Sequence, residues 1–171
     1  MTKAVLVTGG AGYIGSHACK ALARAGYLPV VFDDLSAGHE HAVKWGPLEL
    51  GNLLDMAALD RVITRNDPVA VIHFAGCAIV GESVENPTKY YRNNVAGTLN
   101  LLNAMRRANI GKIVFSSSCT VYGDSGETRL DETHPLAPIN PYGRTKLVAE
   151  RMIADFAAAY GMSYMSLRYF N

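Results

Sequence analysis

Residues 3–15 have the sequence KAVLVTGGAGYIG, in which a short apolar run leads into a turn with four glycines. The run Ala4–Val7 is rich in β-branched residues and is typical of a strand that is buried on both faces. Helical spacing begins at Ile14. A strand, a glycine turn and a helix start bring free backbone N–H groups and the positive end of a helix dipole to one point, which suits a pyrophosphate.

The glycines follow the spacing Gly9-x-x-Gly12-x-x-Gly15, which differs from the commoner G-x-G-x-x-G pattern of dinucleotide-binding turns. Glycine is needed in such a turn because a Cβ atom would block the close approach of a phosphate, and because the turn requires positive φ. The same pattern also occurs in tight turns that bind no ligand. The rest of the chain has to decide between a phosphate site and a structural turn.

Length and charge exclude several classes of protein. The 171 residues are enough for one domain with a core and too few for two domains of ordinary size. Sixteen basic and fifteen acidic residues give a net charge of +1, so we expect neither nucleic acid nor a membrane surface as a partner. No apolar run approaches the ~20 residues of a membrane span, and no signal sequence precedes the first strand, so we expect a cytoplasmic protein.

The three cysteines, Cys19, Cys77 and Cys119, are far apart and form no C-x-x-C pair. We expect them to be buried free thiols in a reducing compartment. The five histidines form no ligand set with these cysteines, so the sequence predicts no metal site. His73 lies inside an apolar run, where a hydrogen-bonded core histidine is the expected role.

Apolar runs alternate with helical patterns along the whole chain. We expect strands at 4–8, 29–33, 47–50, 69–74, 111–117 and 163–169, and helices at 13–26, 55–66, about 87–108 and 141–160, with a short helix near 38–44. This alternation implies right-handed crossovers and a parallel sheet that is covered on both faces. We therefore predict an α/β fold with a doubly wound, Rossmann-like parallel sheet in three αβα layers, whose ligand lies beyond the carboxyl ends of the strands.

Acidic residues follow the second expected strand, at a distance from the glycine turn that is typical of a ribose-binding acid. Asp33 and Asp34 come after its apolar residues 30–32, and Asp33 lies eighteen positions after Gly15. An acid at this distance accepts hydrogen bonds from an adenosine ribose and repels a 2′-phosphate, so the sequence predicts NAD and not NADP. The absence of Arg and Lys from Asp33 to Gly38 supports the same cofactor. An Asp that caps a turn is the alternative.

The later strands end in small or polar residues. Asn52 follows the third strand and is either a contact to the adenine edge or a turn residue. Ala75 and Gly76 follow the fourth strand and would let the backbone lie against a cofactor. The serines at 116–118 end the fifth strand and should face the cleft, unless they form a solvated loop. The segment 121–140 contains Gly and Pro residues and is predicted to be a long loop that borders the site.

The helix that starts near Pro141 carries Tyr142 and Lys146, which lie one turn apart on one face. A phenol with a pKa of about 10 is a poor base at neutral pH, but a nearby ammonium favours the phenolate and lowers that pKa. Lysine also supplies spare donors for a cofactor ribose. The pair therefore predicts a general base that is tuned toward physiological pH.

Longer motifs match one known family. They are VTGGAGYIGSH at 7–17, VIHFAG at 71–76, VGESVENP at 80–87, YYRNNVAGTLNLL at 90–102, FSSSCTVYGD at 115–124, PYGRTK at 141–146 and LRYFN at 167–171. With these motifs, which span the whole chain, the sequence resembles the extended short-chain dehydrogenase/reductase family, and within it the 4-epimerases that act on UDP-hexoses. The fold of that family agrees with the alternation of strands and helices described above.

The resemblance implies roles for the candidate site residues. It implies that Tyr142 is the catalytic base, that Lys146 is its electrostatic partner, and that the Ser118 hydroxyl binds the reacting oxygen of the sugar. It implies UDP-sugar contacts from Ser118, Tyr142 and Asn171. The implied NAD contacts are Gly9, Gly12, Tyr13, Ile14, Gly15, Asp33, Asp34, Leu35, Ser36, Ala37, Gly38, Asn52, Leu53, Phe74, Ala75, Gly76, Ala78, Asn94, Tyr142, Lys146, Tyr169 and Phe170.

The implied reaction is a reversible oxidation at C4 of the sugar of a UDP-hexose, such as UDP-glucose or UDP-galactose. Tyr142 would remove the 4-hydroxyl proton while a hydride passes to NAD, and the hydride would return to the other face of a rotated 4-keto intermediate. Tyr169 and Phe170 would lie by the nicotinamide. Two positions depart from the family pattern: Asn52 stands where an Asp usually accepts the adenine amino group, and Ala78 stands where some members have a cofactor-binding Lys.

Several alternatives accompany this assignment. The resemblance implies that residues 1–171 form the NAD-binding domain and that the substrate domain is largely absent, so the chain alone could be an NAD-binding module without turnover. Epimerases of UDP-N-acetylhexosamines or UDP-pentoses are closer rivals. A 4,6-dehydratase would need an Asp-Glu pair after the threonine that follows the fifth strand, but this place reads Ser118-Cys119-Thr120 and offers no acid. Related proteins commonly form homodimers through helices like those expected at 87–108 and 141–160.

Overall fold

The computed structural model describes residues 2–126 and 129–170. Within these residues, six strands form one sheet: β1 (Ala4–Thr8), β2 (Leu28–Asp33), β3 (Leu48–Leu50), β4 (Ala70–His73), β5 (Lys112–Ser116) and β6 (Ser163–Leu167). All neighbouring strands are parallel, in the order β3-β2-β1-β4-β5-β6. The prediction of a doubly wound α/β fold is confirmed, and each strand lies within two residues of its expected bounds.

The strand order reverses direction between β1 and β4. From β1 the chain proceeds to β2 and β3 on one side, and it then crosses back to place β4 on the other side of β1. The two central strands pair from Val5 with Ala70 to Thr8 with His73. In a sheet of this kind the loops diverge at the reversal, and this leaves a crevice at the carboxyl ends of the strands.

The helices connect the strands on both sides of the sheet. They are α1 (Tyr13–Arg24), α2 (Met56–Asn66), α3 (Val80–Glu85), α4 (Pro87–Tyr90), the π-helical turn η2 (Tyr91–Ala96), α5 (Gly97–Arg107) and α6 (Pro141–Tyr160), with short 3₁₀ turns η1 (Glu40–Ala42) and η3 (Cys119–Tyr122). Among the described residues, no helix combines the length and the apolar character that crossing a bilayer requires.

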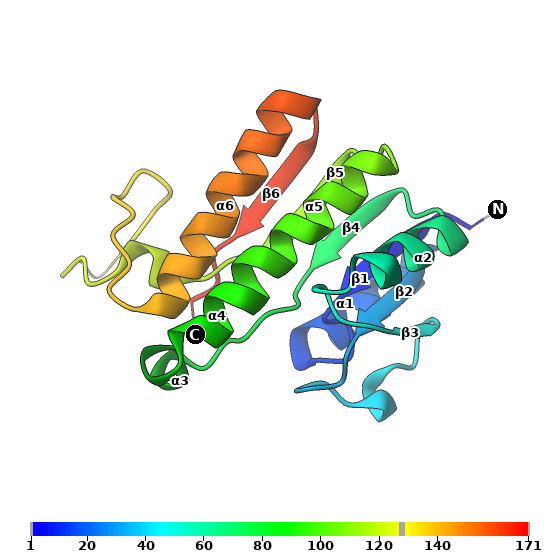
Figure 1. Ribbon diagram of the computed structural model, residues 1–171, viewed down its shortest axis with the longest axis horizontal. Helices are drawn as coiled ribbons and strands as arrows, with labels where there is room; N and C mark the ends of the chain where they lie inside the picture. Colours follow the sequence, from blue (N-terminus) through cyan, green and yellow to red (C-terminus); the bar gives the residue numbers. More distant parts are fainter. Residues whose placement is uncertain (1, 127–128, 171) are drawn as a thin grey trace.

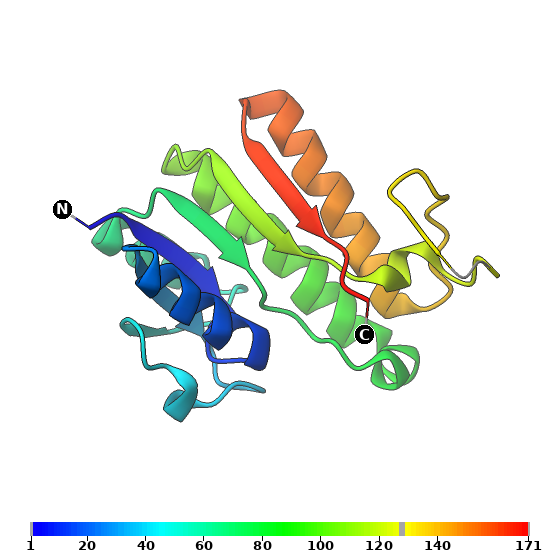
Figure 2. The same cartoon turned by 180° about the vertical axis from the view of Figure 1, so that it is seen from behind.

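The helices form layers of unequal extent. Helices α2, α5 and α6 cover one face of the sheet (Figure 1). On the opposite face α1 lies over β1 and β2, and the described chain places no helix over β4 to β6 (Figure 2). Along β1, Leu6 packs on the α2 and α5 side, whereas Val5 and Val7 pack on the α1 side. The predicted covering of both faces is therefore found only around β1 and β2.

Three local predictions need correction. The single helix expected at about 87–108 is divided into α4, η2 and α5, and α3 precedes it without having been predicted. A 3₁₀ turn, η3, lies at the start of the segment that was expected to be loop, and the short helix near 38–44 is reduced to η1. The π-helical turn holds Asn94, whose side chain leaves the helix to bond the backbone of Cys77, and hydropathy alone does not signal this bond.

The prediction of three buried thiols holds only for Cys19. All three cysteines are free, but Cys77 and Cys119 are half-buried because they follow β4 and β5 at the open edge of the sheet. Burial raises the pKa of the Cys19 thiol to about 11. Cys19 therefore acts as a small apolar core residue on the buried face of α1.

Replacement of Gly15 by alanine should destabilise the fold. An added Cβ would lie 2.2 Å from the carbonyl oxygen of Gly9, so the turn and α1 would have to separate. We expect a loss of about 1–3 kcal/mol in the free energy of unfolding, measured by urea denaturation. Gly81→Ala is the matched control, because a Cβ there has no neighbour within 4 Å. Equal midpoints for the two variants would contradict the proposed tight packing.

Candidate active site

The glycine turn lies between the ends of β2 and β4. Gly9 has φ of +72°, and its amide donates to the Phe32 carbonyl over 2.9 Å. A Cβ on Gly9 would lie 2.5 Å from the amide nitrogen of Ala75, which is backbone and cannot move aside cheaply. Glycine is therefore required at this position by both conformation and packing.

The start of α1, like those of α3 and α5, lacks the side-chain cap that α2, α4 and α6 possess. Gly12 occupies the N-cap position, no side chain bonds the first amides, and the first turn has no acidic residue. By contrast, Asp55, Asn86 and Asn140 cap α2, α4 and α6 through side-chain oxygens. The exposed start of α1 at Tyr13 can therefore offer its N–H groups and its dipole to an anionic ligand.

Asp33 connects the end of β2 to the glycine turn. Its two carboxylate oxygens accept from the amides of Ala11, over 3.0 Å, and Leu35, over 2.9 Å. Each oxygen retains a second lone pair, so both can still accept a ribose hydroxyl. The following loop stays close to the turn, because a Cβ on Gly38 would lie 2.8 Å from that of Ala11. Ser36 and Ala37, which lie in this loop before Gly38, are exposed.

Asp34 and Asn52 form a polar pair beside this loop. The Asn52 amide donates to Asp34 over 2.6 Å, while its Oδ1 accepts from the Leu54 amide over 2.8 Å. Burial works against ionisation of Asp34, but hydrogen bonds from Ser36 and Asn52 outweigh it and hold the pKa of this carboxyl below its ordinary value. Asn52 therefore stabilises the turn that leads into α2, and Leu53 beside it is buried.

Asn94 fixes the backbone that follows β4. Its Oδ1 accepts from the Cys77 amide over 2.8 Å, and its Nδ2 donates to the Cys77 carbonyl over 3.0 Å and to Thr145 Oγ1 over 3.1 Å. Gly76 has φ of +151°, and a Cβ there would lie 2.9 Å from Asn94 Oδ1. Gly76 and Ala78 remain exposed at the crevice, whereas Phe74 and Ala75 are half-buried below them.

His73 is the hydrogen-bonded core histidine that the sequence predicts. Thr8 and Thr98 contact its two ring nitrogens at 2.7 and 2.9 Å. Burial, together with the charge of Lys146, lowers its pKa to about 3, so the ring is neutral at physiological pH. In the part of the chain that the structure describes, no three His, Cys, Asp or Glu side chains gather closely enough to hold a metal ion.

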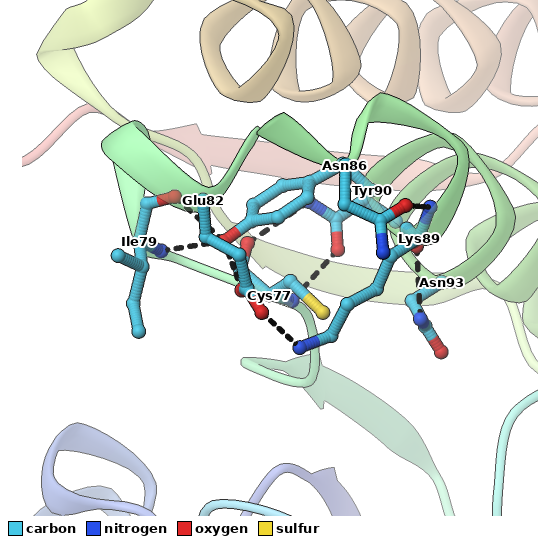
Figure 3. Close-up of polar contacts among 8 residues, drawn as sticks. Cys77, Ile79, Glu82, Asn86, Lys89, Tyr90 and Asn93 are labelled. Carbon is cyan, nitrogen blue, oxygen red and sulfur yellow. Dashed lines mark hydrogen bonds and ion pairs between the residues drawn. The ribbon is translucent and has the colours of Figure 1, made fainter. Parts of the chain in front are cut away.

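A polar cluster holds α3 against α4 beside this segment (Figure 3). The buried Tyr90 hydroxyl lies 2.6 Å from the Ile79 carbonyl and 2.8 Å from the Glu82 carboxylate, and Lys89 lies 2.5 Å from the same carboxylate. Burial and the nearby Glu82 raise the pKa of Tyr90 to about 12. The Tyr90 ring packs edge-on against the Tyr142 ring, with 6.4 Å between the centroids, so the cluster helps to hold Tyr142 in place. The VGESVENP motif at 80–87 pointed to the family but did not indicate that this segment packs against Tyr142.

Helix α6 brings Tyr142 and Lys146 to the crevice. Both side chains are buried, and the Lys146 ammonium lies 5.8 Å from the centroid of the Tyr142 ring. Lys146 donates to the Ser116 carbonyl over 2.8 Å, and burial lowers its pKa to about 8. The Tyr142 amide is bound by Ser83 Oγ over 3.2 Å. Tyr142 and Lys146 therefore lie close together, as their four-residue spacing predicts.

The expected tuning of Tyr142 is not found in this geometry. Burial raises its pKa above the ordinary value of a phenol, although a hydrogen bond with the Ser118 side chain works in the opposite direction. Lys146 is bound to the Ser116 carbonyl rather than to the phenol. Ser118 itself accepts from the amide and the hydroxyl of Thr120, which fixes its side chain at the start of η3.

The segment after β6 lies beside η3. The Tyr169 carbonyl accepts from the Cys119 amide over 3.0 Å, and the exposed Phe170 ring stacks on Tyr122 at 6.1 Å. The structure therefore gathers the predicted residues from β1, β2, β4, β5, β6 and α6 at one edge of the sheet. The predicted substrate contact Asn171 lies outside the described residues.

The contribution of Asn94 can be measured directly. Asn94→Ala removes both bonds to the Cys77 backbone and the bond to Thr145, so we expect a loss of about 1–3 kcal/mol in the free energy of unfolding. Hydrogen exchange of the Cys77 amide should accelerate as well. Asn93→Ala is the control, because Asn93 is exposed to solvent and its side chain donates to the Lys89 carbonyl of its own helical segment. Unchanged protection of the Cys77 amide in Asn94→Ala would refute this role.

Known proteins share both the sequence and the fold. UDP-glucose 4-epimerase of Rhizobium leguminosarum bv. trifolii is 53% identical over 167 residues, which are 98% of this chain and 51% of that protein. The crystal structure of UDP-glucose 4-epimerase from Brucella ovis in complex with NAD matches with a TM-score of 0.97 and 56% identity, over 99% of this chain and 52% of that one.

A more distant structure is similar over the same part. It is UDP-N-acetylglucosamine 4-epimerase from Methanobrevibacter ruminantium M1 in complex with UDP-N-acetylmuramic acid, with a TM-score of 0.91, 35% identity, and coverage of 99% of this chain and 55% of that one. The chain spans about half the length of the curated relatives that it matches. The model of the NAD dependent epimerase/dehydratase family matches residues 5–171. The chain therefore belongs to the NAD dependent epimerase/dehydratase family.

Proposed function

We propose that this chain supplies the cofactor site and the catalytic residues of an enzyme that interconverts the C4 epimers of a UDP-hexose, such as UDP-glucose and UDP-galactose. One observation carries the proposal. Tyr142, Lys146 and Ser118 meet at the edge of the sheet where the glycine turn and Asp33 also lie. A phenol, an ammonium and a hydroxyl beside a dinucleotide site form a set that can oxidise and reduce a sugar hydroxyl.

NAD is the cofactor of this family, so the prediction of NAD is confirmed. The residues of this chain fit it. The uncapped start of α1 suits the pyrophosphate, and the free lone pairs of Asp33 suit the adenosine ribose. The segment from Asp33 to Gly38 has no Arg or Lys that would bind a 2′-phosphate. Lys146 and the backbone at Gly76 would hold the nicotinamide half.

When bound, NAD supplies a ring that takes a hydride from C4 of the sugar and gives it back. The chain's own residues manage the proton and the orientation. Ser118 would hydrogen-bond the C4 oxygen, and Tyr142 would take its proton and later return it. This step needs the phenolate form, which Lys146 would favour from its place 5.8 Å from the phenol ring if its ammonium turned from the Ser116 carbonyl toward the phenol. Between the two transfers the 4-keto sugar would rotate.

The preferred sugar would be chosen by residues outside this chain. Residues 1–171 form the NAD-binding domain in this proposal, and the remaining half of the longer relatives would supply most contacts to UDP and the sugar. An NAD-binding module without turnover is the second candidate, because the chain covers only about half of its relatives. Pairing of two copies and a cytoplasmic location stay predictions.

Replacement of Tyr142 by phenylalanine tests the catalytic assignment. We expect the conversion of UDP-galactose to UDP-glucose by the intact protein to fall about 10²–10⁴-fold, because the variant has no group to exchange the C4 proton. Bound NAD should be retained. Tyr27→Phe, which alters an exposed tyrosine remote from the crevice, should leave the rate unchanged. Wild-type turnover in Tyr142→Phe would overturn the assignment. The same assay on residues 1–171 alone distinguishes the module from the enzyme.

Replacement of Asp33 by asparagine tests the cofactor site without turnover. The variant loses the charge that favours ribose hydroxyls and repels a 2′-phosphate, so NAD should bind about tenfold more weakly while the preference over NADP declines. Titration calorimetry with each dinucleotide measures both effects. Asp60→Asn, on the exposed face of α2, is the control. Unchanged affinity for NAD in Asp33→Asn would exclude the predicted ribose contact.

A further inference from the structure

A buried ion pair lies behind the active site. Glu150 of α6 is 7% exposed, and Arg168, which follows β6, donates to both of its oxygens, from Nε over 3.0 Å and from Nη2 over 2.7 Å. Ser117 donates to the same carboxylate. The hydrogen bonds that Arg168 donates to Glu150 hold the pKa of Arg168 above its ordinary value despite partial burial. This bidentate pair has no part in the proposed chemistry.

The pair shares its helix face with the catalytic residues. Tyr142, Lys146 and Glu150 are spaced four residues apart along α6, so they line one face of the helix. Each contacts a different residue of the serine run at the end of β5. Lys146 bonds the carbonyl of Ser116, Glu150 accepts from the hydroxyl of Ser117, and Tyr142 contacts the side chain of Ser118.

The Ser117 contact lies between the two contacts that involve catalytic residues. Because these three serines are consecutive, a shift of Ser117 would displace the Ser116 carbonyl from Lys146 and the Ser118 hydroxyl from Tyr142. Glu150 therefore fixes the register of the β5 end against α6. A buried ion pair is weak evidence for stability by itself, since its desolvation cost offsets much of its attraction. Its geometry here favours a positioning role.

Arg168 extends the same connection to the segment after β6. Its Nη1 donates to the Tyr122 hydroxyl over 2.8 Å, and Tyr122 stacks on Phe170. The Ser117 amide also donates to the Leu167 carbonyl over 2.9 Å. The segment that would lie by the nicotinamide is thereby attached to the segment that carries Ser118.

The pair also contributes to the electrostatic environment of Lys146. The titratable or charged groups around it are His73 of β4, Cys77 after β4, Tyr142 and Glu150 of α6, and Arg168, which acts through Glu150. His73 is neutral. Burial lowers the pKa of Lys146, and the carboxylate of Glu150 opposes this effect. Arg168, as a cation bound to that carboxylate, should weaken its influence.

We propose that Glu150 and Arg168 are positioning residues of the active site, which hold the serine run and the segment after β6 in place and balance the charge of Lys146. This inference rests on the proposed function for its relevance to catalysis. Its electrostatic part predicts opposite effects for the two residues. Removal of the carboxylate should make Lys146 lose its proton more easily, and removal of the guanidinium should make it keep the proton longer.

Nuclear magnetic resonance titration of the Lys146 side chain in the intact protein tests this balance, with Lys146→Met to assign the signal. Glu150→Gln, which keeps the size but removes the charge and exchanges one acceptor oxygen for an NH2 donor, should lower the pKa of Lys146 by about one unit. Arg168→Met should raise it by about one unit. The alkaline limb of the epimerase rate profile should move in the same directions.

Arg168→Lys is the charge-preserving control and should leave the pKa of Lys146 near its wild-type value. If Arg168→Met does not fold, the comparison of Glu150→Gln with Arg168→Lys decides. Unchanged pKa values for Lys146, or shifts of the same sign in Glu150→Gln and Arg168→Met, would overturn the inference. Opposite shifts in a protein without epimerase activity would support it and would count against the proposed function alone.

Discussion

The close approach of the glycine turn to the end of β4 is the constraint on which the site depends. At Gly9 the two backbones lie so near that a Cβ would be 2.5 Å from the Ala75 amide nitrogen. This contact joins the two central strands at the point where the strand order reverses. Because all the strands are parallel, the ends of β2, β5 and β6 are carried to the same edge. The gathering of the site residues therefore follows from the topology.

Local sequence signals were sufficient to predict the strands, and with them which candidate site residues would lie at the same edge of the sheet. Buried parallel strands need nearly continuous apolar runs, and Ala4–Thr8 is such a run with every residue buried. The alternation of strands and helices then fixes which residues follow a strand. Asp33 could be recognised because it ends β2 at a set distance from the glycines, and Tyr142 with Lys146 because four-residue spacing places them on one helix face.

Contacts between distant segments were beyond prediction. The π-helical turn around Asn94 depends on the Cys77 backbone, seventeen residues away, so helical periodicity alone suggested a continuous helix. The pKa of Tyr142 depends on how deeply the ring is buried, and this burial outweighs the favourable hydrogen bond from Ser118. Glu150 gave no signal, because an acidic residue on a long helix is usually solvated, and its partner Arg168 belongs to another element.

Lys146 lies between the proposed base and the cofactor site, so its protonation matters to both. The groups that influence this protonation lie mainly on α6 and on the segment after β6. His73 lies close enough for the charges to interact, and a protonated ring there would repel the ammonium. Hydroxyl partners surround this ring in place of carboxylates, so nothing compensates the burial that keeps it neutral. Because His73 of β4 is neutral, Cys77 and Glu150 are the groups that oppose the lowering of the Lys146 pKa by burial. Burial raises the pKa of the Cys77 thiol above its ordinary value, so this thiol adds little negative charge at neutral pH. The charge beside the proposed base is therefore set through α6 and the segment after β6, while β1, β2 and β4 remain free to form the cofactor site.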